Sequence, residues 1–180
     1  MRNEDEGLRN SFGRWRGQAF DGRWRAPPAT HNRMRHSASD DYEAWESKVP
    51  ESVSFDRLWM VSAYRLALYA RRKAWPDAMT VARHRIGEPV ARQLYRSVAS
   101  IAANVAEGWS RTTGPERARF FEYALGSARE AIVWYQAAAP VLKSELTQLR
   151  LNRLAEVRRL LLAMIQSERR RHGRVTKRPE

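Results

Sequence analysis

The chain has 180 residues, of which 43% are hydrophobic, and its formal net charge is +13 at pH 7. This length favours one domain, and the lack of both a long apolar run and an N-terminal signal segment favours a cytoplasmic protein with no membrane partner. The sequence has no cysteine, which excludes disulfides, thiol nucleophiles and thiolate metal ligands.

The first fifty residues show no sustained hydrophobic period and contain scattered Gly, Pro and Ser, so we predict a disordered extension over residues 1–50. Within it, the phrase GRWR occurs at residues 13–16 and again at 22–25. Tryptophan between arginines can stack on bases while the cations meet phosphate, as in an RNA-binding arm. A solvated tail, or a start codon assigned upstream of the true one, explains the same segment.

From residue 53 the pattern becomes helical, and we predict a domain of four helices over residues 53–171. Apolar residues recur at three- and four-residue steps over residues 55–69 and predict a first helix that stops at Pro76. A second helix is expected to begin at Pro89, because proline lacks only an N–H that a first turn leaves unpaired. We expect Gly108 to end this helix in a left-handed conformation.

The start of the third helix carries three local signals. Thr113 can cap the helix, Pro115 is preset for its first turn, and Glu116 can close a capping box. Inside this helix, the pair Gly126 and Ser127 costs about 1 kcal/mol of helix propensity. We therefore expect these two small residues to let a neighbouring helix pack close.

The last helix is predicted over residues 146–165, after Pro140 breaks the third helix and before a basic C-terminal tail at residues 172–180. No strand pattern competes anywhere, so the predicted fold is all-α, with an up-down-up-down four-helix bundle as its architecture. Leucines occupy three consecutive positions, 160–162, and cannot all face one core. Apolar surface outside a bundle is usually covered by another subunit, so we expect a homo-oligomer.

No recognisable catalytic or metal-binding set is present. None of the four histidines follows a glutamate by three residues, so the Glu-x-x-His spacing of di-metal bundles is missing. The sequence has neither a nucleophile elbow nor a glycine-rich phosphate loop. We therefore expect a protein that is not an enzyme and that has no catalytic residues, metal or cofactor.

A polar ladder lies near the end of the second helix, where Ser100, Asn104 and Glu107 follow one another at helical spacing. Together with Gly108, we expect it to form a structural joint that fastens the start of the third helix by pairing buried polar groups. The helix dipole disfavours Glu107 at this end, which predicts a compensating partner: Arg111, Arg129 or the exposed amides that open the third helix. A catalytic or ligand-binding role for Asn104 and Glu107 is the alternative.

Positive charge concentrates in the predicted folded part of the chain. Residues 51–180 contain 24 Lys and Arg against 12 Asp and Glu, whereas the first fifty contain 9 against 8. A surface this basic attracts nucleic acid, although enrichment of arginine by a GC-rich genome is an alternative explanation. The candidate phosphate contacts lie in the second helix and its two flanking connections: Arg83, Arg85, Arg92, Arg96, Arg111, Arg117 and Arg119.

Residues 96–130 read RSVASIAANVAEGWSRTTGPERARFFEYALGSARE. The order is Ser-Ile, Asn and Ala-Glu-Gly, followed after a basic turn by an aromatic segment leading to Gly-Ser and Glu. This segment resembles the signature of the four-helix-bundle proteins encoded in 23S ribosomal RNA intervening sequences. Relatives of that family include the accessory variability proteins of diversity-generating retroelements. Ala102 departs from the pattern, because the family often has proline there.

The resemblance implies a non-enzymatic bundle that assembles into a homopentameric barrel. In the retroelement branch it also implies a basic surface that binds nucleic acid, and a reverse transcriptase as partner. The leading hypothesis is thus an oligomer that binds RNA or DNA. A scaffold that binds another protein is the second hypothesis, and an enzyme that uses Glu107 is the third.

Overall fold

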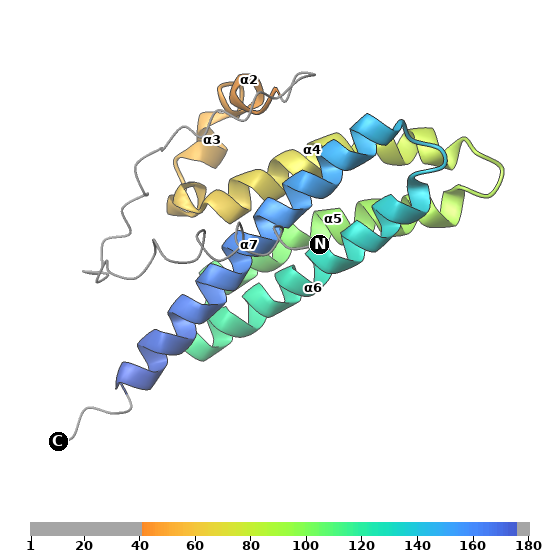
Figure 1. The fold of residues 1–180 in the computed structure, drawn as a ribbon. Helices are drawn as coiled ribbons and strands as arrows, with labels where there is room; N and C mark the ends of the chain where they lie inside the picture. The colour runs from red at the N-terminus through yellow and green to blue at the C-terminus, as the bar shows by residue number, and fades with distance from the viewer. Residues whose placement is uncertain (1–40, 176–180) are drawn as a thin grey trace, which may run out of the picture. The chain divides into compact units, whose positions relative to one another are not determined.

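The computed structural model describes residues 41–175, with side chains as far as residue 172. Within these residues all regular structure is helical, so the all-α prediction is confirmed for this part of the chain. Both GRWR phrases, and with them most of the extension predicted over residues 1–50, lie outside the described residues. The elements, shown in Figure 1, are α2 (Tyr42–Glu46), α3 (Glu51–Ser54), the 3-10 helix η2 (Arg57–Met60), α4 (Ser62–Ala82), α5 (Glu88–Trp109), α6 (Gly114–Ala138) and α7 (Ser144–Val175).

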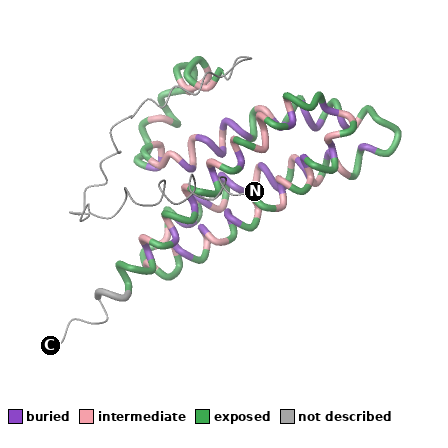
Figure 2. Tube along the Cα trace, viewed as in Figure 1, coloured by how far each residue is buried: buried purple, intermediate pink, exposed green. Residues whose placement is uncertain are grey.

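The four long helices share one apolar core. Helix α5 packs against α4 and α6, while α7 packs against α6 and α4, and consecutive helices run in opposite directions (Figure 1). Buried positions recur along the sides of these helices that face one another (Figure 2). Many of the buried residues are alanines, which let helix backbones approach closely. The largest fully buried side chains are those of Leu94, Ile101, Tyr135, Leu154 and Leu161.

Helix α4 begins and ends later than the sequence pattern predicted. Phe55, expected in the first helical stripe, lies between α3 and η2 and is 81% exposed. Pro76 lies inside α4, and the helix continues beyond it to Ala82. A proline inside a helix removes a hydrogen bond at a cost of about 3 kcal/mol. Burial of Ala78 and Val81 in the following turn offsets this cost.

The predicted boundary at residue 50 also differs from the structure, because α2 forms within residues 41–50. The Tyr42 ring meets Tyr69 of α4 edge to face, with 5.2 Å between the ring centroids. The Tyr69 hydroxyl donates a hydrogen bond of 2.7 Å to Asp41, which also pairs with Lys73. The hydrogen bonds from Lys73 and Tyr69 lower the pKa of Asp41 to about 2. Aromatic packing and these polar contacts thus attach the α2 segment to α4.

A buried carboxylate connects three of the long helices. Asp77 of α4 is 4% exposed and accepts hydrogen bonds from the Tyr135 hydroxyl (2.9 Å) and Arg150 Nε (2.7 Å) at the same oxygen, Oδ2. Arg150 Nη2 donates a further bond of 3.3 Å to Oδ1. Burial, together with the charge of Asp77, raises the pKa of the Tyr135 phenol, which therefore remains a hydrogen-bond donor. Helices α4, α6 and α7 meet at this one group.

The predicted end of α6 agrees with the structure, whereas the predicted end of α7 does not. Helix α6 ends at Ala138, two residues before Pro140, as predicted. Helix α7 continues to Val175, so the predicted basic tail at residues 172–180 begins inside a helix. Of the three consecutive leucines, Leu161 is buried and Leu162 is 39% exposed, which leaves apolar surface outside the core as expected. No helix in the described part of the chain combines the length and apolarity that crossing a membrane requires.

Candidate nucleic-acid interface

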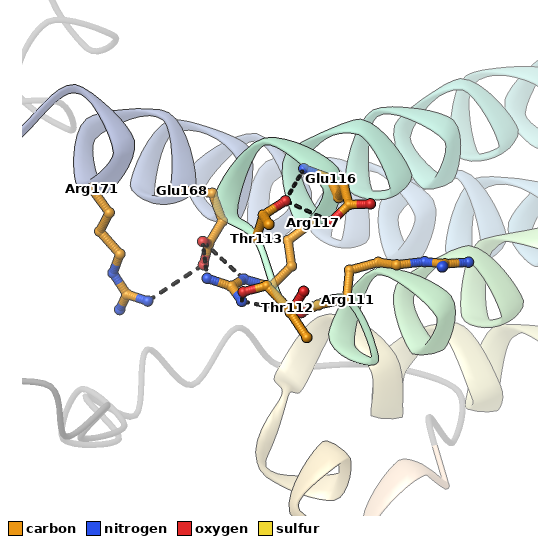
Figure 3. Close-up of polar contacts among 7 residues, drawn as sticks. All are labelled: Arg111, Thr112, Thr113, Glu116, Arg117, Glu168 and Arg171. Carbon is orange, nitrogen blue, oxygen red and sulfur yellow. Dashed lines mark hydrogen bonds and ion pairs between the residues drawn. The ribbon is translucent and has the colours of Figure 1, made fainter. Parts of the chain in front are cut away.

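The turn between α5 and α6 leads into the N-terminus of α6, which is capped by Thr113 (Figure 3). The Thr113 hydroxyl accepts a hydrogen bond from the backbone N–H of Glu116 at 3.4 Å, as predicted for a helix N-cap. The Glu116 carboxylate in turn accepts a bond of 2.6 Å from the Thr113 hydroxyl, not from the backbone N–H that a complete capping box uses. The N-cap at Thr113 is therefore confirmed, and of the two hydrogen bonds of a capping box only the one from the Glu116 N–H is formed.

Arg117 points into this turn and not toward solvent (Figure 3). Its Nη1 atom donates to the backbone carbonyls of Arg111 (3.1 Å) and Thr112 (3.0 Å). Its Nε atom donates to Glu168 of α7 at 3.0 Å, and Glu168 is only 8% exposed. Since these acceptors occupy the guanidinium, we remove Arg117 from the candidate phosphate contacts and regard it as a structural residue.

Only one member of the predicted polar ladder reaches the neighbouring helix. Asn104 Nδ2 donates to the Ser100 carbonyl at 2.9 Å and to the Ser127 hydroxyl of α6 at 3.5 Å. Glu107 pairs with Arg111 one turn further on, which is one of the three partners that the dipole argument allowed, and the two side chains are 47% and 40% exposed. Among residues 41–172, no group of three or more His, Asp or Glu side chains is arranged to hold a metal ion.

Neither Gly108 nor Gly126 has the role that the sequence predicted for it. Gly108 does not end α5, which continues to Trp109 and is capped by Ser110 in a right-handed conformation. A Cβ atom at Gly108 would lie 2.7 Å from the buried ring of Phe121, so glycine is required there for close packing. Gly126, where close packing was expected, is exposed and would have no atom within 4 Å of its Cβ.

The seven candidate arginines lie near the two ends of α5 and do not form one cluster. At 1.5 Å per residue, the helical stretch from Arg92 to Trp109 spans about 25 Å. At the α6 end, the Arg111 guanidinium lies over the Phe120 ring with 4.8 Å to its centroid. Arg119 Nε donates to the Tyr123 hydroxyl at 2.7 Å. Arg111 and Arg117 are thus engaged with the protein itself, whereas Arg119 stays exposed beside Tyr123.

At the other end, Arg83 and Arg85 lie exposed in the turn between α4 and α5. This turn is fixed by Gly87, where a Cβ atom would lie 1.8 Å from the carbonyl oxygen of Val81. No larger residue fits at that position unless the turn moves. The turn therefore presents both guanidinium groups to solvent from a tightly constrained backbone.

Arg92 and Arg96 continue this basic surface along the first half of α5. Their side chains are 71% and 70% exposed. Arg92 donates a hydrogen bond of 2.5 Å to Glu88, and Arg96 lies 3.9 Å from a carboxylate oxygen of Glu130. Exposed ion pairs of this kind contribute about 0–1 kcal/mol, so the arginines remain available to a phosphate.

An open groove of about 730 Å³ lies between α4 and α5 beside Arg92 and Arg96. Alanines of both helices, with Met79, form much of its lining. The rings of Trp75 and Tyr95 meet edge to face, with 5.1 Å between their centroids. The groove was not predicted from the sequence, because the first helix was expected to end at Pro76. The helical spacing of Arg71, Trp75 and Met79 was the signal that could have revealed it.

Comparisons with known proteins bear on the signature and on the helical fold. The family model described as 23S rRNA-intervening sequence protein matches residues 88–163. A crystal structure from Bacteroides thetaiotaomicron, of a protein with unknown function from the S23 ribosomal protein family, is similar with a TM-score of 0.54 and 19% identity. That match covers 57% of this chain and 97% of the other and supports the helical fold alone.

No curated protein matches the chain. The family match includes α5, α6 and most of α7, and with them the signature that carried the resemblance in the sequence. This match confirms the resemblance to the 23S rRNA-intervening sequence proteins over residues 88–163, which are 76 of the 180 residues of the chain.

Proposed function

We propose that this chain is a cytoplasmic, non-enzymatic protein that binds RNA or DNA through exposed arginines at the α4–α5 end. One observation carries the proposal: a constrained turn and the adjoining first half of α5 present four exposed arginines. They are Arg83, Arg85, Arg92 and Arg96. The excess of basic over acidic residues after residue 50 supports the same conclusion.

Phosphate is a suitable ligand for this surface on physical grounds. Guanidinium groups form paired hydrogen bonds to phosphate oxygens, and binding releases counterions from the nucleic acid. The carboxylates that now face Arg92 and Arg96 are exposed and contribute little to holding the arginines. Contacts of this kind do not distinguish sequences, so we expect binding with little sequence preference.

Replacement of Arg83, Arg85, Arg92 and Arg96 by alanine tests the proposal. We expect weaker binding of a labelled oligonucleotide and a loss of up to about four in the slope of log affinity against log salt concentration, because each phosphate contact contributes about one. Fluorescence anisotropy at several salt concentrations measures both quantities.

Arg117→Ala is the matched control, because it also removes an arginine but one that faces Glu168. The control variant should keep the salt slope of the wild-type protein, even if it is less stable. Absence of wild-type binding at low ionic strength would overturn the proposed function. An unchanged slope in the quadruple variant would place the contacts elsewhere on the protein.

We further propose that the four long helices form an up-down-up-down bundle that assembles into a homopentamer, as the family resemblance implies. Exposed apolar side chains such as Val133 (58%) and Leu162 (39%) support burial against another subunit. Sedimentation equilibrium measures the assembly, and a pentamer has five times the 20.9 kDa mass of the chain. A monomer at micromolar concentration would contradict this part of the proposal.

Two partner roles follow from the resemblance. As an accessory subunit in a diversity-generating retroelement, the protein would bind a reverse transcriptase, and a reverse-transcriptase gene beside its own gene would support that role. The alternative is a protein-binding scaffold, which the exposed Phe55 (81%) and Ile86 (78%) favour. A scaffold would retain its protein partner when the four arginines are replaced, whereas a nucleic-acid-bridged complex would not.

A further inference from the structure

Trp75 is an exposed aromatic side chain within the groove between α4 and α5. Its surface is 57% exposed, although large apolar residues are normally buried. The edge-to-face contact with Tyr95 holds the Trp75 ring in place. Much of the rest of the lining consists of small side chains, those of alanines 78, 82, 91, 99 and 103, which leave space above the ring. The groove therefore presents a positioned aromatic surface that is accessible to a planar ligand.

The charged residues that line this groove are mostly basic. Arg71 of α4 and Arg92 and Arg96 of α5 line it, and Glu88 is the one acidic residue among its lining residues. Glu88 is paired with Arg92. A second copy of this basic chain would bring like charges together here, whereas a polyanion would be attracted.

We propose that this groove binds a single-stranded segment of nucleic acid, with a base stacked on Trp75 and the neighbouring phosphates on Arg71, Arg92 and Arg96. The inference rests on the proposed function and adds the class of nucleic acid and the stacking residue. Bases within a duplex are already stacked on one another, so only an unpaired base can reach an aromatic side chain in this way. Any base offers such a face, which makes the contact independent of sequence.

The test compares the wild-type protein with Trp75→Ala for binding of a labelled single-stranded oligouridine and of a labelled duplex, over a range of salt concentrations. Loss of one stacked base is expected to weaken binding of the single strand roughly 5- to 150-fold. The salt slope should stay unchanged, because no cation is removed. Binding of the duplex should be unaffected, and Trp75→Phe should restore most of the affinity for the single strand.

Trp109→Ala is the matched control, because Trp109 is a partly exposed tryptophan (43%) at the far end of α5, outside the groove. It should bind like the wild type, and circular dichroism verifies that both alanine variants remain helical. Equal binding by the wild type and Trp75→Ala would overturn the stacking inference and leave the proposed function intact. Absence of binding by the wild type at low salt would instead overturn the proposed function itself.

Two further outcomes would also overturn the inference. If Trp75→Ala lowers the sedimentation mass, the groove is an interface between copies of the chain. If only replacement of Trp15 and Trp24 by alanine weakens single-strand binding, the stacking residues lie in the N-terminal extension.

Discussion

Asp77→Ala is expected to lower the free energy of unfolding by about 3–5 kcal/mol, because removal of one member of a buried ion pair leaves the other charge uncompensated. In this protein, Arg150 would lose its counter-ion and the Tyr135 hydroxyl its acceptor. Both partners lie on helices other than that of Asp77, so the loss should affect the association of α4, α6 and α7. Urea unfolding at pH 7, followed by circular dichroism, measures the change.

Simultaneous replacement of the three polar residues gives the matched control. A variant with Asp77→Leu, Tyr135→Phe and Arg150→Met removes the whole polar group and leaves no buried charge. Such replacements by apolar residues of similar size are often neutral or stabilising, so this variant should be more stable than Asp77→Ala. If Asp77→Ala lost less than about 1 kcal/mol, the carboxylate would not be the buried centre that its contacts indicate.

Gly108→Ala is expected to destabilise the protein by about 1–3 kcal/mol, the usual range for overpacking a core. The new methyl group would lie 2.7 Å from the Phe121 ring and 3.0 Å from Cβ of Phe120. Phe121 is 2% exposed and has little room to move. The expected result is a lower midpoint in urea with an unchanged slope.

Gly126→Ala, in the next helix, is the control for this prediction, because it makes the same substitution at a position with open space around it. Its Cβ would meet no atom within 4 Å, and alanine is favoured over glycine in a helix interior by about 1 kcal/mol. This variant should therefore be slightly more stable than the wild type. If both alanine variants were stabilised, the close approach of α5 and α6 at Gly108 would be contradicted.

Local signals allowed much of the fold to be predicted from the sequence. Pro89 lies in the first turn of α5 and Thr113 caps α6, because such preferences depend on only a few neighbouring residues. The continuation of α4 past Pro76 was not predictable in this way. It depends on burial of the following turn against other helices, which no local pattern reports.

The candidate site was predictable in composition but not in geometry. Seven arginines around the second helix could be named from the sequence, but the direction of each guanidinium depends on partners far along the chain. Arg117 meets Glu168, fifty-one positions later, and Asp77 meets Arg150 after seventy-three. Pairs at such separations leave no periodic pattern, so Arg117 was predicted to lie on the surface and the buried position of Asp77 was not predicted.

The neighbouring positions of Trp75 and Asp77 constrain how α4 can change during evolution. Trp75 is exposed in the groove, and Asp77 is buried in the core two residues later. Each residue advances a helix by about 100°, so a single inserted or deleted residue earlier in α4 would turn both side chains away from their surroundings. Point substitutions can alter the groove gradually, whereas a change in the length of α4 would disrupt the groove and the core together. Length variation among homologues should therefore be found in the connections and not in this helix.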